Sequence, residues 1–217
     1  MAKKTVFKYP GEKATVSWNG PLCIHVAECG RAKGELFIGG RDPWCKPDVT
    51  SNEEVAEIVK RCPTGALTVD FADGSGTEQP ESANTVHVAY NGPLFVRGRL
   101  AIENAPADAP GLAFRSALCR CGKSRNKPFC DNSHEKDGFS DYGAVGETGA
   151  GDAGVGGELA IKPIKDGPLM LIGNVTIRNS SGREAWKGDR VALCRCGESA
   201  NKPFCDGAHK RAGFKSE

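Results

Sequence analysis

Three cysteines and one histidine recur at the same spacing in two stretches of this chain. The first set is Cys119, Cys121, Cys130 and His134, and the second, 75 residues later, is Cys194, Cys196, Cys205 and His209. Thiolate sulfur and imidazole nitrogen are typical ligands of zinc and iron in proteins. Together the sets use six of the ten cysteines and two of the four histidines. The spacing therefore predicts a metal-binding unit that is used twice.

Within each set the ligands fall into two pairs. Cys119 and Cys121 flank one residue in a turn that contains glycine, so both thiolates can reach one metal ion. Cys130 and His134 are four residues apart, so one helical turn places both side chains on the same face. Two pairs suit a two-iron cluster, in which one iron takes two thiolates and the other takes a thiolate and an imidazole. The alternatives are a tetrahedral zinc site with the same ligands and a cluster that is purely structural.

Other residues in the two stretches are placed to support the ligands. Ser124 and Ser199 can hydrogen-bond within the loop or to a sulfur, and Asp131 and Asp206 can cap the turn that carries the histidine. Basic residues flank both sets: Arg115, Arg120, Lys123, Arg125 and Lys127 at the first, and Arg190, Arg195, Lys202, Lys210 and Arg211 at the second. These charges either compensate an anionic cluster on a solvated surface or form a docking patch for an acidic redox partner.

The full pattern, Cys-x-Cys-x2-Ser-x3-Pro-x-Cys-Asp-Gly-(Ser/Ala)-His, resembles the CDGSH iron–sulfur family. The second copy matches at every position: Cys194, Cys196, Ser199, Pro203, Cys205, Asp206, Gly207, Ala208 and His209. The first departs once, with Asn132 in place of glycine. Asparagine tolerates left-handed backbone better than most residues, so we expect this site to form but to be less stable. The resemblance implies a [2Fe-2S] cluster in each set, held by its three cysteines and its histidine.

Histidine ligation sets the chemistry that we expect of such clusters. A neutral imidazole in place of a thiolate removes a negative charge, which makes reduction easier. Imidazole must also be deprotonated to bind a metal, so protons compete with iron for His134 and His209. This predicts one-electron transfer coupled to protons, in an electron carrier rather than an enzyme. It also predicts a cluster that is lost or handed on as the pH falls.

The N-terminal cysteines form a weaker pattern. Cys23 and Cys29 keep the first and third positions of a Cys-x2-Cys-x2-Cys run, Val26 replaces the second, and Cys62 precedes a proline. Residues 16–69 resemble the divergent single-cluster ferredoxin-like domain, which implies a [3Fe-4S] or [4Fe-4S] cluster on Cys23, Cys29 and Cys62. Cys45 is either a fourth ligand or a buried free thiol. His25 is either a further ligand or a hydrogen-bonded structural residue.

The repeat extends beyond the ligands and indicates the fold. Residues 92–139 align with residues 167–214 without a gap, and short aliphatic runs broken by glycine and proline favour antiparallel strands, with extra strands at 86–90 and 159–163. A repeat this small should bury its apolar face against its copy, as a pseudo-dimer within one chain. In the N-terminal part we expect a strand over 13–18 and a helix capped by Ser51 and running to Arg61, with Val55, Ile58, Val59 and Cys62 on one face.

These elements predict an α+β protein: a mainly β tandem of CDGSH units with a small α/β ferredoxin-like N-terminal domain. The expected boundaries are 1–72 for the ferredoxin-like domain, 73–84 for a linker, 85–142 for the first CDGSH domain, 143–157 for a glycine-rich linker and 158–217 for the second CDGSH domain.

Composition narrows the function further. The formal net charge of +2 gives no reason to expect nucleic acid or membrane as a partner. No run of about 18 apolar residues is present and the first residues lack the apolar stretch of a signal peptide, so a cytoplasmic protein is the default expectation. In a reducing compartment metal ligation is favoured over a disulfide framework. The expected partner is a redox protein or an apo-protein that accepts a cluster. Cluster storage or transfer, and redox or pH sensing, are the alternatives to electron transfer.

Overall fold

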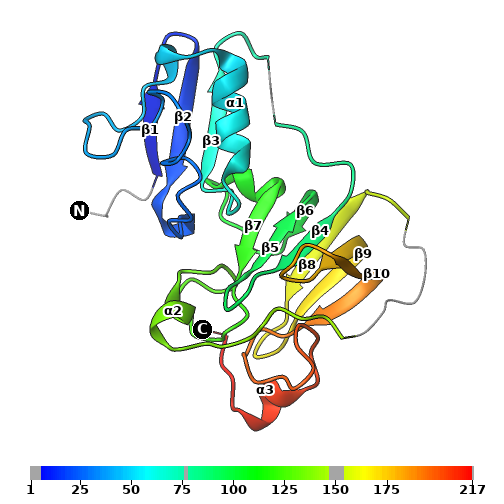
Figure 1. The fold of residues 1–217 in the computed structure, drawn as a ribbon. Coiled ribbons are helices and arrows are strands. Elements are labelled where there is room, and N and C mark those ends of the chain that lie inside the picture. The colour runs from blue at the N-terminus through cyan, green and yellow to red at the C-terminus, as the bar shows by residue number, and fades with distance from the viewer. Residues whose placement is uncertain (1–5, 76–77, 147–153, 217) are drawn as a thin grey trace.

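The N-terminal part of the chain is a small sheet covered by one helix. The computed structural model describes residues 6–75, 78–146 and 154–216. Strands β1 (Val6–Pro10), β2 (Ala14–Asn19) and β3 (Leu67–Phe71) pair antiparallel in the order β1-β2-β3, and helix α1 (Asn52–Arg61) packs against β3. We call residues 6–71 the N-terminal module; it lies at the upper left of Figure 1.

Helix α1 forms as the sequence predicts. The Ser51 hydroxyl accepts a hydrogen bond from the backbone N–H of Glu54 at 3.3 Å, which satisfies one of the free donors at the helix start. Val55, Ile58 and Val59 are buried on one face. The helix ends at Arg61, so the buried Cys62 follows directly at its C-terminus.

The remaining strands form one seven-stranded sheet. They are β4 (Thr85–Val88), β5 (Leu94–Arg97), β6 (Arg99–Ile102), β7 (Arg115–Leu118), β8 (Glu158–Pro163), β9 (Leu169–Arg178) and β10 (Glu184–Leu193). The sheet runs β6-β8-β9-β4-β5-β7, and β10 pairs with β9. The predicted α+β, β-rich architecture is therefore confirmed. We call residues 85–142 the first copy and 158–216 the second copy.

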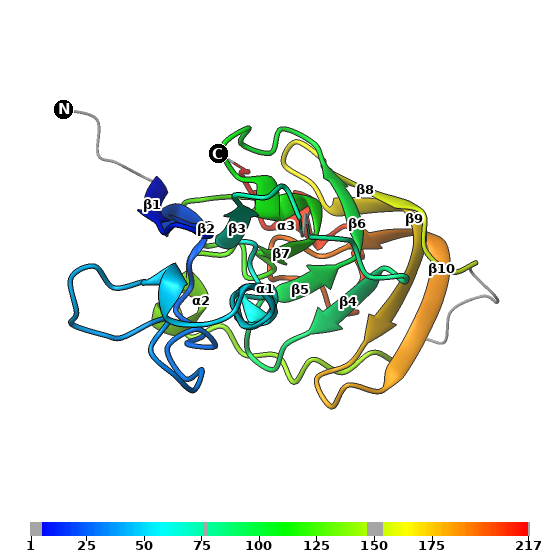
Figure 2. The same cartoon turned by 90° about the horizontal axis from the view of Figure 1, so that it is seen from above.

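The two copies exchange strands. In the first copy β4 pairs antiparallel with its own β5 and parallel with β9 of the second copy. In the second copy β8 pairs antiparallel with its own β9 and parallel with β6 of the first copy. Each copy thus completes the sheet of the other, and the apolar faces of both lie in one core. Figure 2 shows this shared sheet beside the N-terminal module.

The metal-ligand loops lie together at one end of the sheet. Short helices α2 (Ser133–Lys136) and α3 (Ala208–Arg211) carry the two histidines, and both lie at the lower end of Figure 1. The glycine-rich segment expected at 143–157 includes residues 147–153, which fall outside the described residues. Across the described ranges, no helix has the length and apolarity needed to cross a membrane.

A buried arginine fixes the N-terminal module to the first copy. The guanidinium of Arg115 in β7 donates to the carbonyls of Val59 at 2.6 Å and Leu67 at 3.1 Å, and pairs with the Glu78 carboxylate at 2.8 Å. Arg115 is only 1% exposed. The backbones also meet nearby, since a Cβ added at Gly65 would lie 2.5 Å from the Arg115 carbonyl oxygen. The module is therefore a packed part of the fold.

Candidate metal centres

The first set of ligands forms two close pairs. The Sγ atoms of Cys119 and Cys121 are 3.6 Å apart, and Cys130 Sγ lies 3.4 Å from Nδ1 of His134. Cys119 follows the end of β7, and Cys130 and His134 lie on either side of the turn into α2. All four side chains are buried. We call this group the first site.

The second set has the same geometry. Cys194 and Cys196 have their Sγ atoms 3.7 Å apart, and Cys205 Sγ lies 3.5 Å from His209 Nδ1. Cys194 and Cys196 are buried, but Cys205 and His209 are half-buried. We call this group the second site. Its Cys–His pair is more accessible than that of the first site.

These spacings suit two ligands on one tetrahedral metal ion. With metal–sulfur distances of about 2.3 Å and metal–nitrogen distances of about 2.0 Å, two thiolates lie about 3.8 Å apart, and a thiolate and an imidazole about 3.5 Å apart. Every pair in both sites is close to these values. Within the described ranges, no three His, Cys, Asp or Glu side chains gather around a position for a single ion. Each Cys–Cys pair and each Cys–His pair is therefore spaced to hold one metal ion.

Hydrogen bonds within each loop hold the ligand pairs in place. Asp131 accepts from the backbone N–H of Arg125 at 2.9 Å and of Ser133 at 3.0 Å, and so caps the turn into α2. Ser124 donates to the carbonyl of Phe129 at 2.6 Å, which places the serine within the loop rather than on a sulfur. Asp206 and Ser199 repeat these bonds in the second copy.

Backbone amides also point at the sulfurs. The N–H groups of Lys123 and Asn132 lie 3.4 and 3.5 Å from the sulfurs of Cys121 and Cys130. Glu198 and Gly207 repeat these contacts at 3.4 Å each in the second site. Such donors favour the charged thiolate and any anionic cluster that it holds.

The titration of the ligands fits metal binding. Burial raises the pKa of Cys130 to about 12 and that of Cys196 to about 11. In the first Cys–Cys pair a hydrogen bond from Cys121 lowers the pKa of Cys119 and raises that of Cys121. In the first site the three thiols therefore do not ionise together at neutral pH, and a metal must displace the protons of Cys121 and Cys130.

The two sites abut through their glycine turns. A Cβ added at Gly122, where φ is +80°, would lie 2.4 Å from the carbonyl oxygen of Cys196. A Cβ added at Gly197, where φ is +87°, would lie 2.7 Å from the carbonyl oxygen of Cys121. Only glycine fits both the left-handed backbone and this close approach. The turns therefore place the two sites next to each other in a fixed geometry.

Substitution of Gly122 by alanine should destabilise both sites. The new methyl group would meet backbone of the second site, whereas Gly138, with φ of +64°, has nothing within 4 Å of its added Cβ. Gly138→Ala is therefore the matched control, because it carries the left-handed strain without the clash. We expect Gly122→Ala to lower the melting temperature and the iron content of both sites, beyond the effect of Gly138→Ala. Equal effects of the two substitutions would show that the packing of the turns is unimportant.

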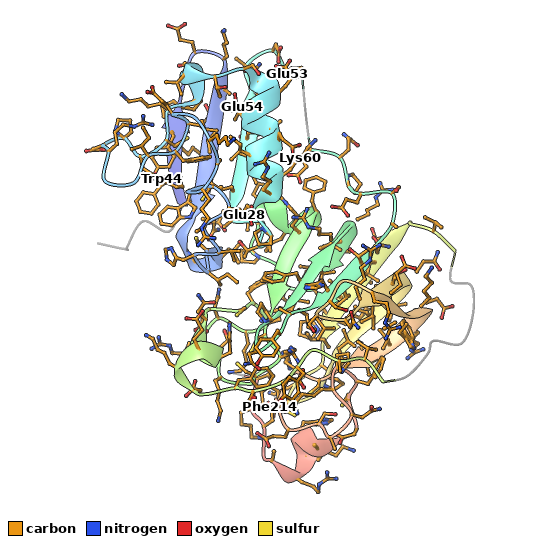
Figure 3. The ribbon with its side chains drawn as sticks, viewed as in Figure 1. Glu28, Trp44, Glu53, Glu54, Lys60 and Phe214 are labelled. Carbon is orange, nitrogen blue, oxygen red and sulfur yellow. The ribbon has the colours of Figure 1, made fainter. Side chains whose placement is uncertain are left out.

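Three N-terminal cysteines line one cavity. It has a volume of about 430 Å³, and Cys23, Cys29 and Cys62 all contribute to its wall. Glu28 and Trp44, labelled in Figure 3, also line it. Burial raises the pKa of Cys29, and the neighbouring Cys62 and Cys23 raise it further. The cavity and its three thiols fit an iron–sulfur cluster on the residues that the sequence indicates.

The structure distinguishes the two remaining N-terminal candidates, Cys45 and His25. Cys45 is 1% exposed, and the residues that line the cavity do not include it. Burial raises the pKa of Cys45 to about 12, as expected for a thiol that packs in a core. The geometry favours the free-thiol interpretation of Cys45. His25 is exposed and does line the cavity, with a left-handed φ of 53°.

Three of the basic residues that flank the ligand sets are buried instead of exposed: Arg115, which contacts the N-terminal module, and Arg120 and Arg195, which lie between the loops. Arg120 is 2% exposed and donates to the carbonyls of Gly92 and Ala89 and to the Asp141 carboxylate. Arg195 is 3% exposed and donates to the carbonyls of Gly167 and Ile164. Neither can belong to a docking patch, and neither belongs to the solvated surface. Sequence reasoning missed this role because the partners are main-chain carbonyls.

Aromatic side chains cover the same two arginines. The Phe139 ring lies 5.0 Å from the Arg120 guanidinium, and the Phe214 ring lies 5.3 Å from that of Arg195. Phe214, labelled in Figure 3, is also 6.0 Å from the ammonium of Lys127 in the first copy. These contacts tie the end of the second copy to both loops.

Comparison with known proteins agrees with this geometry. The family described as "Iron-binding zinc finger CDGSH type" matches residues 91–135 and 166–210. The family described as "Divergent 4Fe-4S mono-cluster" matches residues 9–70. The uncharacterized protein YjdI of Escherichia coli K12 is 41% identical over 59 residues, which are 27% of this chain and 78% of that protein. YjdI of Escherichia coli O157:H7 gives the same values. No solved structure matches the chain.

Proposed function

Because the chain belongs to the CDGSH iron–sulfur family and carries a divergent single-cluster ferredoxin-type domain, we propose that it is a one-electron carrier with three clusters. Two are [2Fe-2S] clusters, on Cys119, Cys121, Cys130 and His134 and on Cys194, Cys196, Cys205 and His209. The third is a [3Fe-4S] or [4Fe-4S] cluster on Cys23, Cys29 and Cys62. The pairing of the ligands, each pair spaced for one metal ion, carries the assignment of two irons to each of the first two sites.

The protein residues perform the tasks that a carrier needs. When bound, each cluster would supply a centre that gains or loses one electron. The buried thiols and the amides aimed at their sulfurs hold the anionic group and exclude water. Nδ1 of each histidine faces the cysteine sulfur, so Nε2 remains to hold a proton. This arrangement supports the proton-coupled transfer that we propose.

The exposure of the second site supports a second candidate function. Cys205 and His209 are half-buried, and exposed Lys210 and Arg211 stand beside them. A cluster at this position can be approached by another protein, and the positive charge would favour an acidic one. Transfer of this cluster to an apo-acceptor is therefore the alternative to electron transfer to a redox partner.

Redox cycling separates the two candidates. The holoprotein would be reduced and reoxidised repeatedly, with the iron and sulfide content measured before and after and the reduced clusters followed by EPR. A carrier should cycle without loss of iron. Transfer of iron and sulfide to an apo-ferredoxin at neutral pH, with matching loss of absorbance from this protein, would instead establish the donor function.

Acid should remove the cluster of the second site first. Protonation of the histidine competes with iron, and burial lowers the pKa of His134 below its usual value of 6.5, so the first site should resist acid to a lower pH. Asn132 in place of glycine predicts that the first site is the less stable of the two. The burial of the ligands of the first site favours the opposite order of stability. We expect His209→Cys to slow the loss of visible absorbance between about pH 7 and pH 5, the range in which histidine titrates. Equal rates for His209→Cys and the parent would contradict this account.

A further inference from the structure

Asn132 contacts both the first site and the N-terminal module. Its backbone N–H lies 3.5 Å from Cys130 Sγ, a ligand of the first site. Its side-chain Nδ2 donates to the carbonyl of Ile24 at 2.7 Å. Ile24 directly follows Cys23, which lines the N-terminal cavity. One residue therefore connects a ligand of one site to the neighbour of a ligand of the other.

The second copy shows that the loop does not need this side chain. Gly207 occupies the equivalent position, with φ of 83° against 66° for Asn132. Its N–H makes the same contact with Cys205 Sγ at 3.4 Å. Glycine also adopts the left-handed region more readily than asparagine does. The asparagine side chain thus serves the contact with Ile24 rather than the turn.

The contact is part-buried, and a second hydrogen bond joins the same two segments. Ile24 is 5% exposed and lies in a small apolar cluster with Ala117 and Cys130, against which Phe95 packs. A second amide, Nδ2 of Asn126, donates to the carbonyl of Pro21 at 2.9 Å. Among the described residues, these two amides tie the N-terminal module to the loop of the first site, and Cys205 of the second site is more exposed than Cys130.

We infer that the N-terminal cavity and the first site form one electron-transfer unit, in which Asn132 is the positioning residue at the junction. The inference rests on the proposed function. A cluster held by Cys23, Cys29 and Cys62, once reduced by a low-potential one-electron donor, would give its electron to an oxidised cluster held at the first site. The N-terminal cluster would be oxidised by one electron and the cluster at the first site reduced by one electron, and no covalent bond would form or break. Histidine ligation favours this direction because it raises the potential of the acceptor.

The second site is the place at which an electron would leave this unit for an external acceptor. Its glycine turn abuts that of the first site, and its Cys–His pair is the more accessible of the two. The covered first site then acts as the internal step between a donor at the N-terminal module and an acceptor at the second site. The difference between Asn132 and Gly207 follows from this order, because Asn132 contacts the N-terminal module through Ile24.

The test is rapid reduction of the holoprotein by substoichiometric dithionite, with freeze-quench EPR of each cluster. In the unsubstituted protein we expect a fast phase in the reduction of the cluster at the first site. After full reduction with excess dithionite, we expect magnetic broadening of that cluster's EPR signal by the reduced, paramagnetic N-terminal cluster. Asn132→Gly, which copies the loop of the second site, should lose the fast phase and weaken the broadening while it retains its iron. Asn126→Ala removes a neighbouring amide contact of the same kind but not the one at a ligand, and it should retain both features.

The outcomes separate the inference from the proposed function. Iron and sulfide counts that lack the clusters would overturn the proposed function. A full set of clusters without broadening in the unsubstituted protein, or with the fast phase unchanged in Asn132→Gly, would overturn the inference alone. If Asn132→Gly loses iron, the broadening in the unsubstituted protein decides: its presence supports the unit and its absence refutes it.

Discussion

Replacement of Cys194 by alanine is expected to remove one two-iron cluster from the protein and to leave the other in place. Cys194 and Cys196 form the pair that is spaced for one metal ion, so the loss of one thiolate leaves that ion with a single ligand from the pair. The first site keeps all four of its ligands. We expect the iron content to fall by about two atoms per chain, the content of one [2Fe-2S] cluster, with an equal loss of sulfide.

The chain offers two controls for this experiment. Cys119→Ala should have the mirror effect, with loss of the first cluster and retention of the second. Cys45→Ala should retain all the iron, because Cys45 is buried outside the cavity that Cys23, Cys29 and Cys62 line. Loss of iron from Cys45→Ala would make Cys45 a ligand. Metal analysis that finds one zinc ion per site, without sulfide, would contradict the two-iron assignment.

The second large effect is expected from Arg115→Ala. This substitution leaves the carbonyls of Val59 and Leu67 and the largely buried carboxylate of Glu78 without their partner. Removal of one member of a buried ion pair costs about 3–5 kcal/mol. We expect a loss of that order in the free energy of unfolding of the N-terminal module. Urea titration of the holoprotein, followed by the fluorescence of Trp18 and Trp44, measures it.

Removal of both charges should cost less than removal of one. Burial raises the pKa of Glu78 in spite of Arg115, and burial lowers the pKa of Arg115 in spite of Glu78. Desolvation thus outweighs the attraction within this pair. We expect Arg115→Met with Glu78→Leu to recover part of the lost stability. Arg97→Ala removes the exposed pair with Glu81 and exposed hydrogen bonds to the Lys60 carbonyl, and we expect it to cost much less than Arg115→Ala. A double variant as unstable as Arg115→Ala would contradict this ranking.

The local features of this protein follow from its sequence because their causes are local. Ser51 and the apolar spacing of Val55, Ile58 and Val59 are enough to place α1. The spacing of Cys130 and His134 is enough to predict that they meet, since a single turn joins them. The ligand pairs of both sites were predicted for this reason, and the structure brings each pair together.

Features that depend on distant partners could not be predicted. The alternation of residues in β4 indicates a strand but does not say that β9 of the other copy lies beside it. The sequence next to Arg120 and Arg195 does not distinguish them from surface arginines. Only the fold brings main-chain carbonyls to them. Asn132 was noticed as a departure from the family pattern, but its partner Ile24 is 108 residues away.

The exchange of strands between the copies determines when the sheet of each copy can be completed during translation. While the chain is being made, β4 emerges long before β9, so the sheet that supports the first site is incomplete until the second copy has left the ribosome. We therefore expect iron and sulfide to enter the first site after the second copy has been made. A chain interrupted within the second copy would lack the strands that complete the sheet of the first copy.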